Sequence, residues 1–247
     1  MRSISNLIRR RLRPTLILAL AIGLAAPAAA SALNVFAASS LREVFTQIDP
    51  SPTYNFGGSN QLQLQIERGA DADVFASASS QEPQALFKAG KCDRPVTFAT
   101  NKLVLIVPKG NPGKITSVRS LRAGGKNLAI GNAGVPIGDY TRKLLRRLGL
   151  SRALTRNTVS QEPNVASIVS KVGLGSADAG FVYVTDAKIA NDRVQAIRLP
   201  RYAQPPVRYQ ICRVKRNAES AAFIAKVRSG RGRSLLKAAG FGLPPKG

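Results

Sequence analysis

A short apolar run, a turn of small residues and then a helix recur along this chain, and this pattern restricts the fold more than any other feature. Residues 33–38 are typical of a buried strand, and Ser40 with Glu43 forms an S-x-x-E capping box that would start a helix. The same order returns over residues 53–68, where Gly58-Ser59 lies between strand and helix. Strands that alternate with helices at this spacing predict βαβ units and parallel sheets.

The pattern breaks near residues 95–101 and then resumes, which predicts two α/β lobes. A strand over residues 128–130 leads through a glycine-containing loop to Pro136, which suits the first turn of a helix. We expect two doubly wound lobes joined by a two-segment hinge. The first would hold residues 33–98 plus about 208–247, and the second about 99–207.

The first 32 residues are typical of a secretory signal peptide. They contain five arginines, an apolar run over residues 16–26 and small residues before the expected cleavage site after Ala30 or, preferably, Ala32. The apolar run is shorter than the roughly 20 residues that a membrane-spanning helix needs. The sequence therefore predicts secretion across the cytoplasmic membrane, into the periplasm or onto the extracytoplasmic face.

The charge is strongly basic. The formal net charge of the whole chain is +24, and subtracting the five leader arginines leaves +19. Such a balance raises the alternative of a secreted protein that binds nucleic acid or another polyanion. No basic motif interleaved with aromatic residues accompanies the charge, and the basic residues after Pro136 lie opposite the leucines of the expected helix. We therefore interpret them as a solvated face and expect no nucleic-acid partner.

The residue types needed for most catalytic and metal sites are scarce. The chain has no histidine, and its 13 acidic residues do not cluster at ligand spacing, which argues against an enzyme and against a site for a free metal cation. Cys92 and Cys212 enter a compartment where disulfides form. We expect a bridge between them, with two separately buried thiols as the alternative.

Several expected helix starts share the ability to bind a small anion, because the first N–H groups of a helix have no internal partner. Any one of these serines alone would be an ordinary helix cap. Two such starts in each of two matching lobes favour an anion site built from neutral donors. These starts lie at Ser39 and Ser40, at Ser59 and Asn60, at residues 135–138, and at Asn164 and Val165.

Six stretches resemble the periplasmic molybdate-binding proteins, which are the substrate-binding components of molybdate ABC transporters. The stretches are VFAASSL, FGGSNQLQLQIERGADADVFASAS, FATNKLVLIVPKGNP, VPIGDYTRKLLRRLGL, EPNVASIVSKV and ADAGFVYVTDA. The resemblance implies a type II-like bilobal periplasmic-binding-protein fold that closes on molybdate or tungstate. It also implies a monomer without a cofactor that delivers the oxyanion to an ABC permease of the inner membrane. A general sulfate-type carrier is the alternative.

The resemblance also implies which residues bind the oxyanion. The family's serine hydroxyls correspond to Ser40 and Ser59, its backbone donors to Ile137 and Val165, and its tyrosine hydroxyl to Tyr183. Ser39, Gly58 and Asn60 are expected as neighbours.

Overall fold

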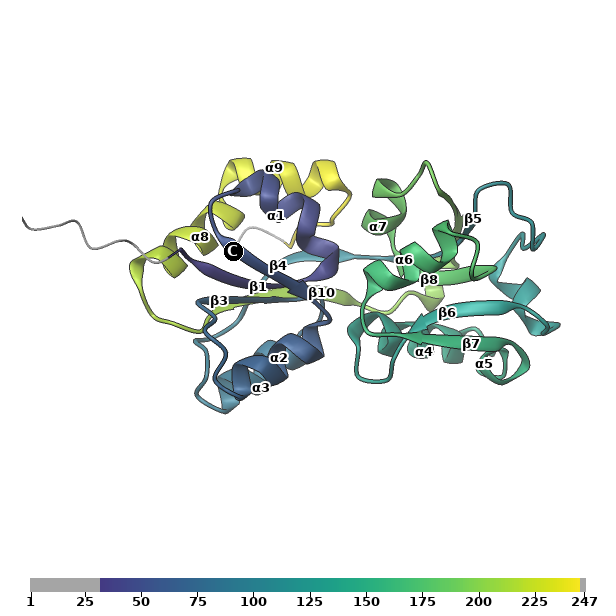
Figure 1. Cartoon of the computed structure of the whole chain (residues 1–247), viewed down its shortest axis with the longest axis horizontal. Coiled ribbons are helices and arrows are strands. Elements are labelled where there is room, and N and C mark those ends of the chain that lie inside the picture. Colours follow the sequence, from purple (N-terminus) through teal and green to yellow (C-terminus); the bar gives the residue numbers. More distant parts are fainter. Residues whose placement is uncertain (1–31, 245–247) are drawn as a thin grey trace, which may run out of the picture. The chain divides into compact units, whose positions relative to one another are not determined.

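The structure is a computed structural model that describes residues 32–244, and it holds two five-stranded mixed sheets with helices packed against them (Figure 1). The predicted signal peptide lies outside the described residues, apart from Ala32. Within residues 32–244, every helix is too short or too polar to cross a membrane.

The first sheet has the strand order β2-β1-β3-β10-β4. Strand β1 pairs in parallel with β2 and β3, whereas β10 runs antiparallel to β3 and β4. Its strands are β1 (Asn34–Ala38), β2 (Thr53–Gly57), β3 (Val74–Ser77), β4 (Val96–Asn101) and β10 (Val207–Arg213). Its helical elements are η1 (Ser39–Leu41), α1 (Arg42–Ile48), α2 (Ser59–Glu67), α3 (Gln81–Lys88), α8 (Ala218–Arg228) and α9 (Gly230–Ala239).

The second sheet has the order β7-β6-β8-β5-β9 and the same mixture of directions. Strand β6 pairs in parallel with β7 and β8, and β5 runs antiparallel to β8 and β9. Its strands are β5 (Leu103–Pro108), β6 (Asn127–Gly131), β7 (Thr158–Glu162), β8 (Ala179–Tyr183) and β9 (Val194–Arg198). Its helical elements are η2 (Val118–Arg122), α4 (Pro136–Arg147), α5 (Ala153–Arg156), α6 (Val165–Gly173), α7 (Val184–Ile189) and η3 (Arg201–Ala203).

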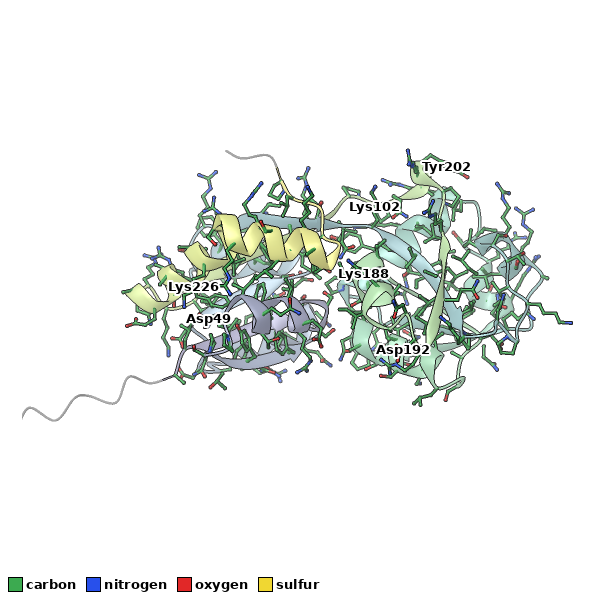
Figure 2. All side chains as sticks on the ribbon, turned by 90° about the horizontal axis from the view of Figure 1, so that it is seen from above. Asp49, Lys102, Lys188, Asp192, Tyr202 and Lys226 are labelled. Atoms are coloured by element: carbon green, nitrogen blue, oxygen red, sulfur yellow. The ribbon has the colours of Figure 1, made fainter. Side chains whose placement is uncertain are left out.

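The chain passes between the two sheets twice. Strand β4 ends at Asn101 and β5 begins at Leu103, so the outward crossing is at Lys102, which Figure 2 labels. The return lies between η3 and β10. Each sheet with its helices forms one lobe, and the first lobe is assembled from two separate chain segments.

Long-range contacts hold those two segments of the first lobe together. Phe45 of α1 packs edge-on against Phe223 of α8, with ring centroids 5.5 Å apart. The ammonium of Lys226 lies 2.6 Å from the carboxylate of Asp49 at the end of α1 (Figure 2). Burial of such aromatic side chains supplies most of the free energy that holds the two segments together. The C-terminal helices are therefore an integral part of this lobe.

A glycine contact sets the position of α4 at the end of β6. A Cβ atom added to Gly138 would lie 2.2 Å from the carbonyl oxygen of Asn132 and 2.3 Å from that of Gly131. Only glycine permits this approach of helix and strand. The first turn of α4 is therefore held directly against the end of the second sheet.

Candidate functional site

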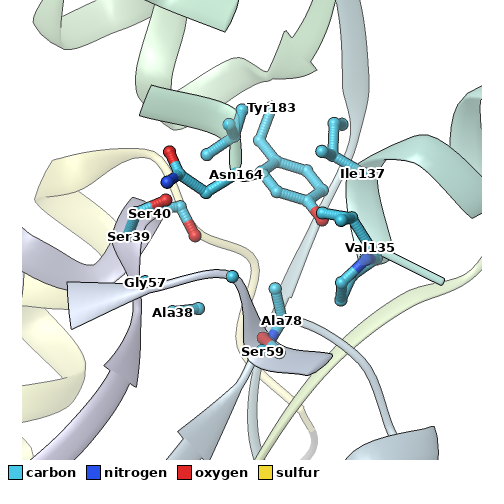
Figure 3. Close-up of a pocket in the computed structure, with 13 residues that line it drawn as sticks. Ala38, Ser39, Ser40, Gly57, Ser59, Ala78, Val135, Ile137, Asn164 and Tyr183 are labelled. Atoms are coloured by element: carbon cyan, nitrogen blue, oxygen red, sulfur yellow. The ribbon is translucent and has the colours of Figure 1, made fainter. Parts of the chain in front are cut away.

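A small cavity of about 10 Å³ lies between the two lobes, where the starts of several helices meet (Figure 3). Both lobes contribute to its wall, and none of its lining residues carries a formal charge. The lining residues are Ala38, Ser39, Ser40, Gly57, Gly58, Ser59, Ala78, Val135, Pro136, Ile137, Asn164, Val165 and Tyr183.

All five residues predicted as oxyanion ligands line this cavity, although they lie in five different elements or turns. Of the three predicted neighbours, Ser39 and Gly58 also line it. Asn60 does not, but its side-chain oxygen is buried and has no hydrogen-bond partner among the described residues. Their role as ligands stays a prediction.

The hydroxyl of Ser40 faces the cavity and does not cap a helix. Ser40 lies within the 3₁₀ turn η1, the N-cap of α1 is Leu41, and α1 has no side-chain capping bond. The predicted Ser40–Glu43 capping box is therefore wrong, because the 3₁₀ turn moves the helix start beyond Ser40. Its hydroxyl oxygen instead lies 2.9 Å from that of Tyr209.

Ser59 is likewise the first residue of α2 and not its cap, which is Gly58. The prediction that this serine caps the helix is wrong for that reason. Its hydroxyl oxygen accepts a 3.1 Å hydrogen bond from the backbone N–H of Ala78. Because that oxygen accepts this hydrogen bond, the hydroxyl proton of Ser59 is free to form a hydrogen bond with another acceptor.

The second lobe adds backbone donors from two helix starts. Pro136 and Ile137 begin α4, and Val165 begins α6 after Asn164. The side chain of Asn164 accepts from the backbone N–H of Ser167 at 3.0 Å, which is an ordinary N-cap. The earlier N–H groups of both helices have no intrahelical acceptor, so those of Ile137 and Val165 suit an anion.

Tyr183 ends β8 and brings a hydroxyl to the cavity (Figure 3). Its side chain is only 1% exposed, and its oxygen has no hydrogen-bond partner among the described residues. Burial raises the pKa of Tyr183 well above its ordinary value of 10, so the hydroxyl stays protonated at neutral pH. An unpaired buried hydroxyl costs about 1–3 kcal/mol, which a ligand oxygen would offset.

Asp186 lies in the turn after Tyr183 and gives a test of pH dependence. Burial raises its pKa to about 7, against hydrogen bonds from backbone N–H groups that lower it. Its carboxylate accepts from the N–H of Tyr183 at 3.0 Å. Because the folded state holds a proton here that the unfolded state releases near pH 4, this group stabilises the fold below pH 4, and the contribution is lost as pH rises to about 7.

We expect Asp186→Asn to abolish a pH-dependent part of the stability. The wild-type free energy of unfolding should lose about 4 kcal/mol from this group between pH 4 and 7, whereas the asparagine variant should not. Urea unfolding at intervals across pH 4–8 measures the difference between the two chains. An identical slope for both would show that the carboxyl of Asp186 has an ordinary pKa.

The two cysteines lie side by side away from the cavity. Both are buried free thiols, and a hydrogen bond with Cys92 followed by burial raises the pKa of Cys212. The residues that follow them are paired, since the N–H of Asp93 donates to the carbonyl of Arg213 at 2.9 Å. The bridge expected from the sequence stays a prediction.

Comparison with known proteins identifies the family. The family model described as bacterial extracellular solute-binding protein matches residues 33–242. The chain is 38% identical over 228 residues to Molybdate-binding protein ModA of Mycobacterium tuberculosis, covering 87% of this chain and 86% of that one. It belongs to the bacterial extracellular solute-binding proteins. Within that family, the identity to the mycobacterial relative assigns it to the molybdate-binding group.

Solved structures agree on the bilobal fold. The periplasmic molybdate-binding protein of Azotobacter vinelandii superposes with a TM-score of 0.77 at 26% identity, over 86% of this chain and 99% of that one. The sulfate-binding protein SubI of M. tuberculosis superposes with a TM-score of 0.72 at 16% identity, over 86% of each chain. The second likeness concerns the fold alone. Proteins named for different oxyanions therefore share the periplasmic-binding-protein fold of this chain.

The sequence did not point to Tyr209 or Ala78 as parts of the site. Each forms a hydrogen bond with a serine hydroxyl, and Tyr209 is 169 positions from Ser40. Tyr209 sits in a strand that reaches the first sheet only after the chain has built the whole second lobe. Only the sheet order reveals that it faces Ser40.

Proposed function

We propose that this chain captures molybdate or tungstate in the cavity between its lobes and delivers the oxyanion to an ABC permease of the inner membrane. The observation that carries the proposal is the buried hydroxyl of Tyr183, which has no hydrogen-bond partner within residues 32–244 and lines the same neutral cavity as Ser40 and Ser59. The names of the relatives support the choice of oxyanion.

A cavity of neutral donors suits a carrier that must release its cargo. A dianion held by buried arginines would form strong charge-assisted hydrogen bonds and leave slowly. Here hydroxyl and backbone N–H groups offer several weaker bonds. The chain acts as a binding protein and not as an enzyme, the metal enters as part of the oxyanion, and no cofactor is required.

The two crossings of the chain serve as the hinge of a monomer that closes on its ligand. We assign residues 33–98 and about 208–247 to one lobe and about 99–207 to the other, as the sequence pattern predicts. Closure brings Ser40 and Ser59 from one lobe toward Ile137, Val165 and Tyr183 from the other. After removal of residues 1–32, the protein works in the periplasm or at the extracytoplasmic face.

Selection against sulfate follows from the size of the cage. Donors fixed on helix starts and strand ends cannot all follow a smaller tetrahedron, so sulfate makes fewer good hydrogen bonds. The competing function is a general sulfate-type oxyanion carrier.

A thermal-shift panel tests the proposed function. Micromolar molybdate or tungstate should raise the melting temperature, because a ligand that binds only the folded state stabilises it. Sulfate at the same concentration should not. Equal shifts for sulfate and molybdate would favour the general sulfate-type carrier.

The variant Tyr183→Phe sharpens the test, because its two effects have opposite signs. Removal of an unpaired buried hydroxyl should leave the ligand-free protein at least as stable as the wild type. The molybdate-induced shift should shrink, with affinity falling about tenfold. A full-sized shift in this variant would remove Tyr183 from the site.

A further inference from the structure

We infer that Glu82 is a positioning residue for the oxyanion site. Its carboxylate holds the turn around Ala78, so that the backbone N–H of Ala78 meets the hydroxyl oxygen of Ser59. The inference rests on the proposed function, because Ser59 is one of the proposed ligands. Glu82 itself does not line the cavity between the lobes but a neighbouring cavity of about 310 Å³. Its hydrogen bonds to the turn are therefore the route by which it reaches Ser59.

The turn that Glu82 holds links the end of β3 to the start of α3. Ser77 is the last residue of β3, Ala78 follows it, and Glu82 lies in the first turn of α3. The side chains of Ser77, Ser79 and Glu82 are all buried. Their polar groups therefore depend on one another for hydrogen bonds.

One oxygen of the Glu82 carboxylate accepts hydrogen bonds from both serine hydroxyls of the turn. The Ser77 hydroxyl donates to Oε2 at 2.8 Å, and the Ser79 hydroxyl donates to the same oxygen. The backbone completes the network. The N–H of Ser79 donates to the hydroxyl oxygen of Ser77, and the N–H of Gln81 donates to that of Ser79, each at 3.0 Å. Because the two serines flank Ala78, Glu82 fixes the turn on both sides of it.

The N–H of Ala78 is the group that this network delivers to the ligand site. Figure 3 shows Ala78 beside Ser59 at the wall of the cavity, and its N–H donates to the Ser59 hydroxyl oxygen at 3.1 Å. Because that oxygen accepts, the one proton of the Ser59 hydroxyl remains for another acceptor. An oxyanion without protons needs such a donor. A shift of the Ala78 N–H would release Ser59 from this orientation.

The stability of the fold does not by itself favour a carboxylate at this position. Among residues 32–244, Glu82 forms no ion pair, and burial of a carboxylate costs free energy that two hydroxyl donors offset only in part. A negative charge in the first turn of α3 also interacts favourably with the helix dipole. That interaction depends on the charge, whereas the hold on the turn depends on the accepting oxygen.

Molybdate affinity, measured by calorimetry in the full mature chain, separates these two roles. Glu82→Ala removes the accepting oxygen and should weaken binding roughly tenfold. Glu82→Gln keeps an accepting oxygen but removes the charge, so it should bind nearly as tightly as the wild type. Wild-type affinity in both variants, with lowered melting temperatures, would limit Glu82 to a structural role and overturn the inference. An equal loss in both would also contradict it, because the charge would then be the cause.

A double-mutant cycle shows whether the effect of Glu82 passes through Ser59. In the Ser59→Ala background, Glu82→Ala should cause no further loss of affinity, whereas additive losses would refute the inference. If Glu82→Ala does not fold, Ser79→Ala replaces it in the cycle with the same expectation, because it removes one of the two hydroxyls that the carboxylate holds.

Asp49→Ala is the matched control. Asp49 is another buried carboxylate of the first lobe, which accepts from the N–H of Ser51 at 3.1 Å, pairs with Lys226 and lies outside the cavity. Its removal should lower the free energy of unfolding but leave molybdate affinity unchanged. An affinity loss equal to that of Glu82→Ala would contradict the inference, because any buried carboxylate would then have the same effect. These outcomes bear on Glu82 alone, whereas a wild-type chain that binds no oxyanion would overturn the proposed function as well.

Discussion

Replacement of Gly58 by alanine should weaken molybdate binding by about 10- to 100-fold while leaving the stability of the ligand-free protein unchanged. A Cβ atom at this position would lie 2.3 Å from the backbone carbonyl oxygen of Pro163, which belongs to the other lobe. The backbone of Gly58 has φ −70° and ψ 132°, which alanine adopts freely. Inside the first lobe the added atom would lie 3.1 Å from the side-chain oxygen of Asn60, which can move, so the main penalty falls on closure.

Gly57→Ala is the matched control for this prediction. A Cβ atom there would lie 3.4 Å from the side chain of Leu62 in its own lobe, which is an ordinary contact, and would meet no atom of the second lobe within 4 Å. Calorimetric titration of both variants with molybdate, beside urea unfolding without ligand, separates closure from stability. Equal affinities for Gly58→Ala and the wild type would mean that the bound state does not bring these two lobes into contact.

Oxidation of Cys92 and Cys212 to a disulfide should give the largest gain in stability. The bridge would close a loop of roughly 120 residues that contains the entire second lobe, for which the chain-entropy model gives about 4–5 kcal/mol. The paired backbone at Asp93 and Arg213 already holds the two thiols next to each other. Oxidised glutathione can accept the two thiol hydrogens during refolding.

Intact-mass measurement and urea unfolding, each with and without reductant, check this prediction. The non-reduced protein should lack the mass of two hydrogen atoms and unfold at higher urea. The variant with both cysteines changed to serine should lose this difference yet retain molybdate affinity, because neither cysteine lines the cavity. Two free thiols in protein purified from the exported fraction would contradict the expectation.

Much of the fold follows from local sequence signals. The strand before Ser40, the Gly-Gly-Ser turn before α2 and the proline that starts α4 all combine strong apolar runs with turn or cap residues. Strand β9 and helix α7 were not anticipated. Strand β9 is an edge strand with a largely exposed pattern, and the six residues of α7 are too few to give a helical period.

The candidate site was predictable only in part, for a physical reason. Residues that meet the ligand from helix starts leave a local signature, and Ser40, Ser59 and Ile137 carry it. Residues that contact those groups from the protein side leave none, because Tyr209 reaches Ser40 through sheet pairing. The misassigned caps at Ser40 and Ser59 have the same origin. Their hydroxyls bond to distant partners, which a local capping pattern cannot anticipate.

Anomalous diffraction at the molybdenum absorption edge, from crystals grown with molybdate, tests the proposed function most directly. The expected result is one molybdenum peak inside the cavity, with its oxygens about 2.5–3.0 Å from the hydroxyls of Ser40, Ser59 and Tyr183. A peak elsewhere on the protein, or an empty cavity at saturating molybdate, would contradict the proposal.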